Sequence, residues 1–144
     1  MTPNSDLFEP LSWSQLLLRL SCALIAGAII GAEREAKHKP AGLRTNMLVS
    51  FGSSLFVMVP IETGMASASV DALSRAIQGI ITGVGFVGAG TILRDKRVRG
   101  LTSATATWVS AALGIAAGCG LWQLGLISAA IAWIILRVLE KVES

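Results

Sequence analysis

The side chains with the greatest capacity for chemistry lie just after the first long apolar stretch of the sequence. Glu33 follows that stretch directly, so its carboxylate could be drawn into the mouth of a helix bundle. A carboxylate in such a place needs a cation, a hydrogen-bond donor or a proton. Arg34 and Arg44 are close enough in sequence to supply the cation, and a metal ion is the alternative.

The segment that carries Glu33 has the charge spacing of a helix end. Two pairs of opposite charge stand four residues apart, Glu33 with Lys37 and Glu35 with Lys39, in the order that favours ion pairs on a helix. Pro40 is predicted to end this helix, and Gly42 permits the turn that follows. His38 lies among lysines and a proline, so it is predicted to be a solvated loop residue rather than a ligand.

A second group of polar residues begins an uncharged segment much later in the chain. It contains Thr102, Ser103, Thr105 and Thr107. Mg²⁺ takes octahedral oxygen ligands and keeps much of its water, so one carboxylate backed by hydroxyls would suit it. Glu33 with Thr102 and Thr105 is therefore a candidate metal site, if the two segments meet. The alternative is that the hydroxyls bond to carbonyls of their own helix.

The elements that must position these residues are long apolar helices. The sequence has no charged residue from Gly100 to Leu136. About 20 apolar residues cross the ~30 Å hydrocarbon core of a bilayer, so this stretch predicts two crossings that turn at Gly118-Cys119-Gly120. Charged residues make up 15% of the chain, against about 25% in soluble domains. Cys22 and Cys119 both lie in apolar stretches and are predicted to be buried and unpaired.

Five segments are predicted to span the membrane, approximately residues 11–32, 45–61, 76–93, 100–118 and 121–139. The fold class is therefore an all-α, polytopic membrane helix bundle, and residues 1–144 form a single transmembrane domain. Residues 1–13 contain no Lys or Arg, so the first span is expected to be a retained helix rather than a signal peptide. Arg19 in that span is either an interfacial anchor beside Trp13 or a buried partner for a carboxylate.

The basic residues predict the direction of the chain in the membrane. Lys and Arg gather in the first and third connections and after the last span, at Arg34, Lys37, Lys39, Arg44, Arg94, Lys96, Arg97, Arg99, Arg137 and Lys141. Cytoplasmic loops carry such an excess, so the N-terminus is predicted to be outside and the C-terminus cytoplasmic. The net charge of +3 then reflects the orientation of the chain in the membrane. Nucleic-acid binding is not expected, because it needs a basic face on a solvent-exposed domain.

Glycines are concentrated in the third predicted span. Residues 83–88 match the pattern GxGxxG, but a nucleotide site requires a strand before that pattern and a helix after it. Close helix packing is the preferred interpretation, with Gly79 and Gly83 one turn apart in the manner of Gly27 and Gly31. A thinned or broken helix that lines a permeation path is the alternative.

Four motifs in this order resemble the MgtC/SapB family. They are Gly-Ala-Glu-Arg-Glu at 31–35, Ala-Gly-Leu-Arg-Thr at 41–45, Gly-Phe-Val-Gly-Ala-Gly at 85–90 and Gly-Leu-Thr-Ser-Ala-Thr-Ala-Thr-Trp at 100–108. The resemblance implies a multi-pass protein of the bacterial plasma (inner) membrane, described as a magnesium transporter or a factor for growth under magnesium limitation. Some members are thought to regulate other membrane proteins, including the ATP synthase. Longer members carry a soluble C-terminal domain, and this chain resembles a short form without it.

The resemblance also selects residues, without saying whether they bind an ion or hold the bundle together. They are Glu33, Arg34, Glu35, Gly42, Arg44, Thr45, Gly85, Gly88, Gly90, Gly100, Thr102 and Trp108. At 102–103 this chain has Thr-Ser where many members have two threonines, which keeps a hydroxyl at each position.

Two functions fit these observations. The first is a small cation-handling protein, although the basic loops would repel a dication at the cytoplasmic mouth. The second is a non-transporting regulatory subunit that docks in the bilayer on another membrane protein such as the ATP synthase, or on a second copy. An enzyme is not expected, because no nucleophile and base stand together. No cofactor is expected beyond Mg²⁺ as a ligand or substrate.

Overall fold

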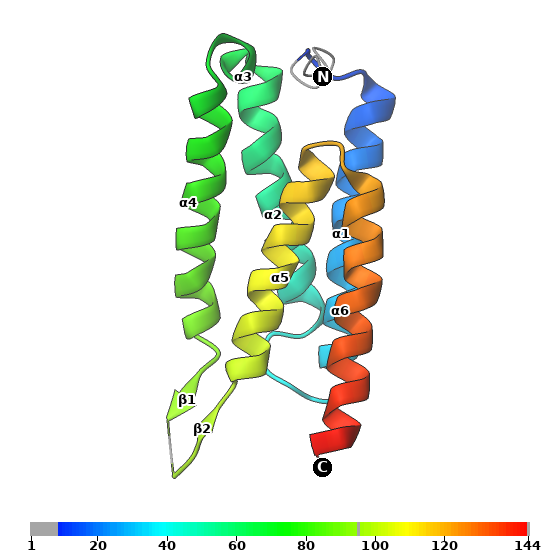
Figure 1. Cartoon of the computed structure of the whole chain (residues 1–144), viewed down its shortest axis with the longest axis vertical. Helices are drawn as coiled ribbons and strands as arrows, with labels where there is room; N and C mark the ends of the chain where they lie inside the picture. The colour runs from blue at the N-terminus through cyan, green and yellow to red at the C-terminus, as the bar shows by residue number, and fades with distance from the viewer. Residues whose placement is uncertain (1–8, 95, 144) are drawn as a thin grey trace.

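The computed structural model describes residues 9–94 and 96–143, and these residues form a bundle of long helices (Figure 1). The elements in order are α1 (Trp13–Ala36), α2 (Leu43–Glu62), α3 (Met65–Ala68), α4 (Val70–Ala89), β1 (Leu93–Arg94), β2 (Val98–Arg99), α5 (Leu101–Gly118) and α6 (Trp122–Glu143). Within the described residues, α1, α2, α4, α5 and α6 are long and apolar enough to cross a membrane. The prediction of a helical fold with five helices of spanning length is confirmed, but the third helix begins six residues earlier and ends four residues earlier than the predicted span 76–93, because Gly90 ends it before the β1–β2 hairpin.

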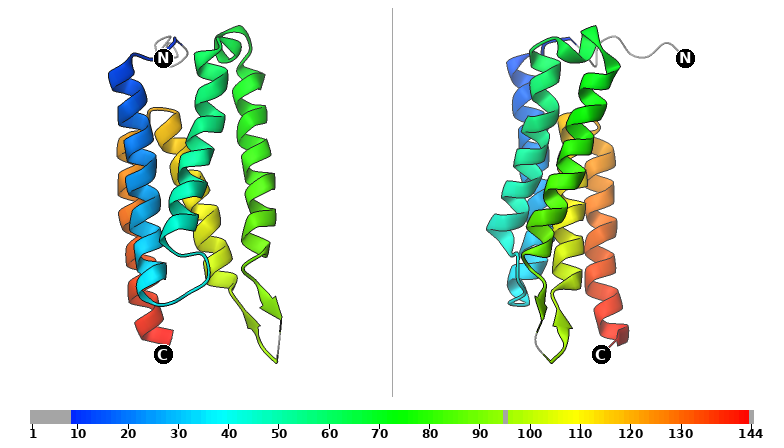
Figure 2. Two further views of the ribbon diagram at one scale, coloured as in Figure 1. Left: turned by 180° about the vertical axis from the view of Figure 1, so that it is seen from behind. Right: turned by 90° about the vertical axis from the view of Figure 1, so that its left-hand side faces the viewer.

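The connections gather at the two ends of the bundle. The α1–α2 loop, the β1–β2 hairpin and the end of α6 lie at one end, and the short helix α3 and the α5–α6 turn lie at the other (Figures 1 and 2). β1 and β2 pair antiparallel, with Leu93 opposite Arg99. The end with the α1–α2 loop therefore carries the basic connections, and the α3 end has few charges.

The ends of α1 follow from local hydrogen bonds. At its start, the Ser12 hydroxyl accepts from the Gln15 N–H at 3.4 Å and the Gln15 side chain accepts from the Ser12 N–H at 3.0 Å, which is a capping box. At its end, the helix stops at Ala36 rather than running on to Pro40. It nevertheless extends beyond the predicted span end at residue 32, so Glu33 and Arg34 belong to the helix.

Helix α2 lies at the centre of the bundle, between α1 and α5. Its small residues face glycines on both neighbours. A Cβ built on Gly27 would lie 2.7 Å from the backbone carbonyl oxygen of Asn46. A Cβ built on Gly118 would lie 2.8 Å from the backbone carbonyl oxygen of Ser54. A Cβ on Gly114 would overlap the Ser50 carbonyl. These glycines let the backbones of α1, α2 and α5 approach closely, which is how helices associate in lipid.

The glycines of α4 do not all follow that pattern, so the prediction of close packing holds only in part. Gly88 does pack closely, since a Cβ there would lie 3.2 Å from the Ala104 oxygen of α5. At Gly79, Gly83 and Gly85 a Cβ would meet nothing within 4 Å. The reason is the position of α4 at the edge of the bundle, where only 17% of the most apolar stretch of this helix is buried.

Arg19 is buried inside the bundle, so its interpretation as an interfacial anchor is wrong. Its side chain is 6% exposed and donates from Nη1 to the Gly118 carbonyl oxygen at 2.8 Å. The partner is the last turn of α5 rather than a carboxylate, and a cation there complements the helix dipole. Gly120, at φ +81°, completes the turn, and a Cβ on it would lie 2.9 Å from the Arg19 guanidinium. The predicted α5–α6 turn is confirmed.

Candidate functional site

The last turns of α1 carry a buried ion pair. Glu33 and Arg34 are each 3% exposed, and the Arg34 Nη1 lies 3.4 Å from the Glu33 Oε2. Arg34 also donates from Nη2 to the Ser103 hydroxyl of α5 at 3.2 Å. The other Glu33 oxygen, Oε1, lies 3.0 Å from the Lys37 Nζ. Both oxygens of this carboxylate therefore face protein cations, and the predicted Glu33–Lys37 pair is confirmed.

The ion pair extends to the last helix. Lys37 also contacts the Glu140 carboxylate of α6, and Lys39 lies 3.8 Å from the same carboxylate. Glu33, Arg34, Lys37, Lys39 and Glu140 together are called the charge cluster below. It joins α1, α5 through Ser103, and α6 at the end of the bundle where the α1–α2 loop lies.

The charge cluster has more cations than anions, three against two. Glu33 is fully desolvated, so its negative charge must be compensated within the protein. Arg34 and Lys37 supply that compensation. Among the described residues, the buried Glu33 Oε1, Arg34 Nε and Glu140 Oε2 atoms have no hydrogen-bond partner, and the two carboxylate oxygens are met by the Lys37 ammonium as an ion pair. The cluster therefore needs Glu33 as a counter-charge, and this favours a structural role for the carboxylate over metal ligation.

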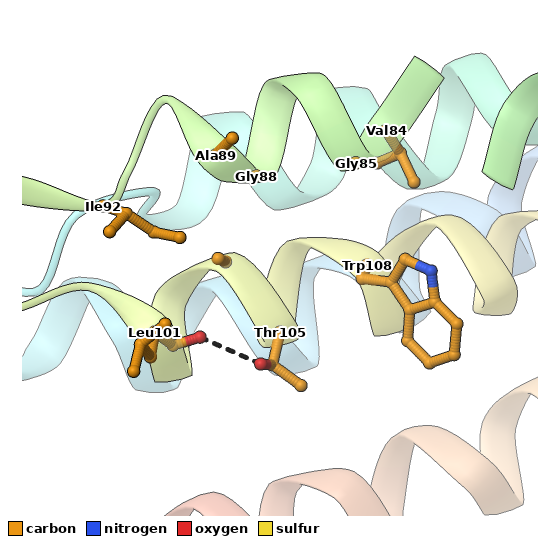
Figure 3. A pocket seen from close by; sticks show the side chains of 9 residues that line it. Val84, Gly85, Gly88, Ala89, Ile92, Leu101, Thr105 and Trp108 are labelled. Carbon is orange, nitrogen blue, oxygen red and sulfur yellow. Dashed lines mark hydrogen bonds between the residues drawn. The ribbon is translucent and has the colours of Figure 1, made fainter. Parts of the chain in front are cut away.

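No hydrogen bond or ion pair joins the predicted magnesium ligands Glu33, Thr102 and Thr105 in the described part of the chain. Thr102 and Thr105 are exposed on α5, whereas Glu33 is buried. The Thr105 hydroxyl donates to the Leu101 carbonyl of its own helix at 2.9 Å, as Figure 3 shows. Among the described residues, no group of three or more His, Cys, Asp or Glu side chains is placed to hold a metal ion. Thr105 and Thr107 follow the alternative of bonding to helix carbonyls, and the Ser103 hydroxyl is the one that reaches the charge cluster.

Glu35 has a different partner from the predicted one. Its Oε2 accepts from the Leu43 N–H at 3.0 Å, so it caps the first turn of α2 rather than pairing with Lys39. A carboxylate at a helix N-terminus satisfies a free N–H group and complements the dipole. A Cβ on Gly42 would overlap this carboxylate, so a larger residue there would require the Glu35 side chain to move. Arg44 is exposed and Thr45 is half-buried in the next turn.

The remaining family residues shape the α4–α5 connection. Gly100 precedes α5 at φ +91°, and a Cβ on it would overlap the Thr91 carbonyl. Gly90 ends α4. Between the two helices lies an apolar groove of about 330 Å³ whose lining includes Gly85, Gly88 and Trp108 (Figure 3). These residues therefore position a turn and a groove, and within the described residues no hydrogen bond or ion pair joins them to the charge cluster.

A buried amide was missed by the sequence analysis. Asn46 has no exposed surface, and its Nδ2 donates to the carbonyls of Ala41 at 2.7 Å and Gly42 at 3.0 Å. Its Oδ1 lies 2.7 Å from the Ser110 hydroxyl of α5. Asn46 thus fastens the α1–α2 loop to α5. The signal that could have found it is spacing, because Asn46, Ser50 and Ser54 recur every four residues on α2.

The sequence profile of the MgtC family matches residues 20–144. Protein SrpB of Synechococcus elongatus is 51% identical over 126 residues, which cover 80% of this chain and 69% of SrpB. "Putative magnesium transporter YhiD" of Escherichia coli K12 is 40% identical over 134 residues, which cover 89% of this chain and 62% of YhiD.

A third relative is matched over a smaller share of its own length. Protein MgtC of Salmonella typhimurium is 42% identical over 105 residues, which cover 72% of this chain and 43% of that protein. The chain thus spans about two thirds of SrpB and YhiD and less than half of MgtC. No solved structure matches. The family profile covers most of the chain and the described helices have the length and hydropathy of membrane spans, so this multi-pass membrane protein belongs to the MgtC/SapB family.

Proposed function

We propose that this protein acts in magnesium homeostasis in the bacterial plasma membrane, as a regulatory subunit that docks on another membrane protein and moves no ion itself. The magnesium context comes from the family and from the name of the relative YhiD. One observation carries the choice of a regulatory role. Glu33, the carboxylate at the mouth of the bundle, is enclosed by Arg34 and Lys37 rather than free for Mg²⁺.

The α4–α5 groove supports lateral docking. Its lining combines small residues with a tryptophan, and Phe86 beside it is 84% exposed. Glycines at such a surface allow the backbone of another transmembrane helix to come close. We expect the partner to contribute an apolar helix that packs along α4 and α5. The proposal includes no enzymatic step, no cofactor and no nucleic acid.

An orientation with the N-terminus outside and the C-terminus in the cytoplasm is part of the proposal. It is supported by the basic α1–α2 loop and β1–β2 hairpin, which lie at the same end of the bundle as the end of α6. Lys and Arg of short loops remain on the cytoplasmic side. The α3 end would then face the periplasm or the cell exterior.

Cysteine labelling in intact cells tests this orientation. Ser67 and Ala36 are exposed near opposite ends of the bundle, so each is replaced by cysteine in a Cys119→Ser background. A membrane-impermeant maleimide is expected to label the Ser67→Cys variant directly and the Ala36→Cys variant only after the cells are opened. Labelling of the Ala36→Cys variant from outside would reverse the orientation.

Flux measurement tests the absence of transport. The purified protein is placed in liposomes loaded with a Mg²⁺-sensitive dye, and an outward-to-inward Mg²⁺ gradient is applied. We expect the dye signal to match that of protein-free liposomes, because the charge cluster presents cations to an entering dication. Saturable uptake that the Glu33→Ala variant abolishes would contradict the proposal.

Growth at limiting Mg²⁺ tests the docking surface. The gene is returned to a bacterial strain that lacks its family members. The Gly85→Leu variant is expected to lose complementation, because the new side chain fills the α4–α5 groove, where a Cβ meets no neighbour within 4 Å. A leucine at exposed Ile131 of α6 serves as the matched control and is expected to complement fully. Full complementation by Gly85→Leu would exclude this groove as the docking surface.

Magnesium transport is the second candidate function. It is favoured by the name of YhiD and by a buried carboxylate at the mouth of the bundle. Transport would require Glu33 to leave Arg34 and Lys37 for the ion. The flux measurement separates the two candidates.

A further inference from the structure

A second groove, between α2 and α4, has no role in the proposed function. It has a volume of about 560 Å³, within the ~300–1,000 Å³ that ligand sites usually occupy. Its lining is mostly apolar, with Ser53 in the wall formed by α2 and Arg75 near one end. Gly52 on α2 and Gly79 and Gly83 on α4 leave it open, because a Cβ at any of the three would meet nothing within 4 Å.

The groove crosses the middle of the bundle. Its lining on α4 begins at Arg75, in the second turn of that helix, and ends at Val87, and twelve helical steps of about 1.5 Å give a length of roughly 18 Å. On α2 the lining extends from Phe56 to Leu48, in the second turn of that helix. Arg75 therefore marks the end of the groove nearer to α3, and the other end of the groove approaches the end of the bundle where the α1–α2 loop lies.

Arg75 supplies a charge at the mouth of the groove. It is the only Lys or Arg between Thr45 and Leu93, at the end of the bundle that is otherwise poor in basic residues. Its side chain is exposed and makes no hydrogen bond or ion pair with any described residue, including Asp71 one turn earlier on α4. An exposed guanidinium without a partner among the described residues is suited to a phosphate group.

We infer that the α2–α4 groove binds one acyl chain of an anionic phospholipid, with the lipid phosphate held by Arg75. The apolar walls match the chain, and the single cation at the mouth matches the headgroup. The lipid belongs to the leaflet at the α3 end, and the site is separate from both the charge cluster and the α4–α5 groove.

Native mass spectrometry from nanodiscs tests this site. The chain is placed in nanodiscs of equal phosphatidylglycerol and phosphatidylethanolamine, and the lipid that it retains on release is counted. We expect one phosphatidylglycerol per chain. The Arg75→Gln variant should retain it about fivefold less, the loss expected for one cation near an anionic headgroup. The Gly83→Leu variant should retain neither lipid, because leucine occupies the place of the chain.

Two matched variants keep the result specific. Arg99→Gln removes an exposed arginine from β2 at the other end of the bundle, and Gly85→Leu fills the neighbouring groove. Both should retain phosphatidylglycerol like the parent, and circular dichroism should show the same helicity in every variant. Equal retention by Arg75→Gln and Gly83→Leu would overturn the inference. So would a lipid-free dimer that Gly83→Leu separates, since a second copy would then cover the groove.

Discussion

Replacing Glu33 with glutamine is expected to destabilise the protein by about 3–5 kcal/mol, the cost of removing one partner from a buried ion pair. The glutamine side chain has nearly the same shape but no charge. It leaves Arg34 buried, with the Ser103 hydroxyl as its remaining hydrogen-bond partner and an Nε that already lacks one among the described residues. Unfolding in a denaturing detergent, followed by circular dichroism, measures the loss.

A double variant separates the charge from the shape of the site. Glu33→Gln combined with Arg34→Met removes both charges and keeps the volume, so most of the stability should return. Glu35→Gln is the matched single control, because Glu35 is an exposed carboxylate that caps α2, and its loss should cost about 1 kcal/mol. If Glu33→Gln were as stable as the parent, the ion pair would have no structural role.

Replacing Gly114 with alanine is expected to destabilise the protein by about 2–3 kcal/mol, as overpacking does in a dense interior. The added methyl group would overlap the Ser50 carbonyl oxygen. Ser50 cannot move away easily, because its hydroxyl donates to the Ala23 carbonyl of α1 at 2.7 Å and it lies between three helices. Helices α2 and α5 must therefore separate, and detergent unfolding reports the change.

Gly83→Ala is the matched control for this prediction. Both glycines lie inside membrane helices, but a Cβ at Gly83 meets nothing within 4 Å. The control should be as stable as the parent or slightly more stable, because alanine favours the helix. Equal behaviour of Gly114→Ala and Gly83→Ala would contradict the close approach of α2 and α5.

The lengths of the helices were predictable from sequence, but which face of each helix is buried was not. Long uncharged stretches predict spans because lipid cannot satisfy backbone groups. In lipid, however, both the inner and the outer face of a helix are apolar, so hydropathy does not show which face is buried. This is why Thr102 and Thr105 were grouped with Glu33, whereas the buried hydroxyl beside Arg34 is that of Ser103. The spacing of Ser103, Thr107 and Ser110 indicates the buried face better than residue type does.

The same limit applies to the glycines. Gly-x-x-x-Gly occurs at Gly27 and Gly31, at Gly79 and Gly83, and at Gly114 and Gly118. The first and third pairs pack against α2, and the second is open. The motif indicates that another helix could approach closely. The arrangement of the helices then determines which of these glycine pairs pack against a neighbouring helix of the same chain.

Partners that are distant in sequence could not be predicted. Arg19 bonds to a carbonyl 99 residues away, because the α5–α6 turn lies beside α1. Local spacing correctly predicted the Glu33–Lys37 pair, where both residues lie on consecutive turns. For Glu35, the local pattern favoured Lys39, but the helix ended first, and the free N–H groups of α2 supplied a closer donor.

The dependence of thermal stability on Mg²⁺ tests most directly whether Glu33 is a structural anion or a magnesium ligand. A ligand that binds only the native state adds about 2.7 kcal/mol at a concentration of 100 Kd, so a magnesium site would raise the Tm. We predict that the Tm of the parent in Mg²⁺ equals its Tm in choline chloride of matched ionic strength. A saturable, Mg²⁺-specific rise in the parent that is lost in the Glu33→Gln/Arg34→Met variant would contradict this prediction and make Glu33 a magnesium ligand.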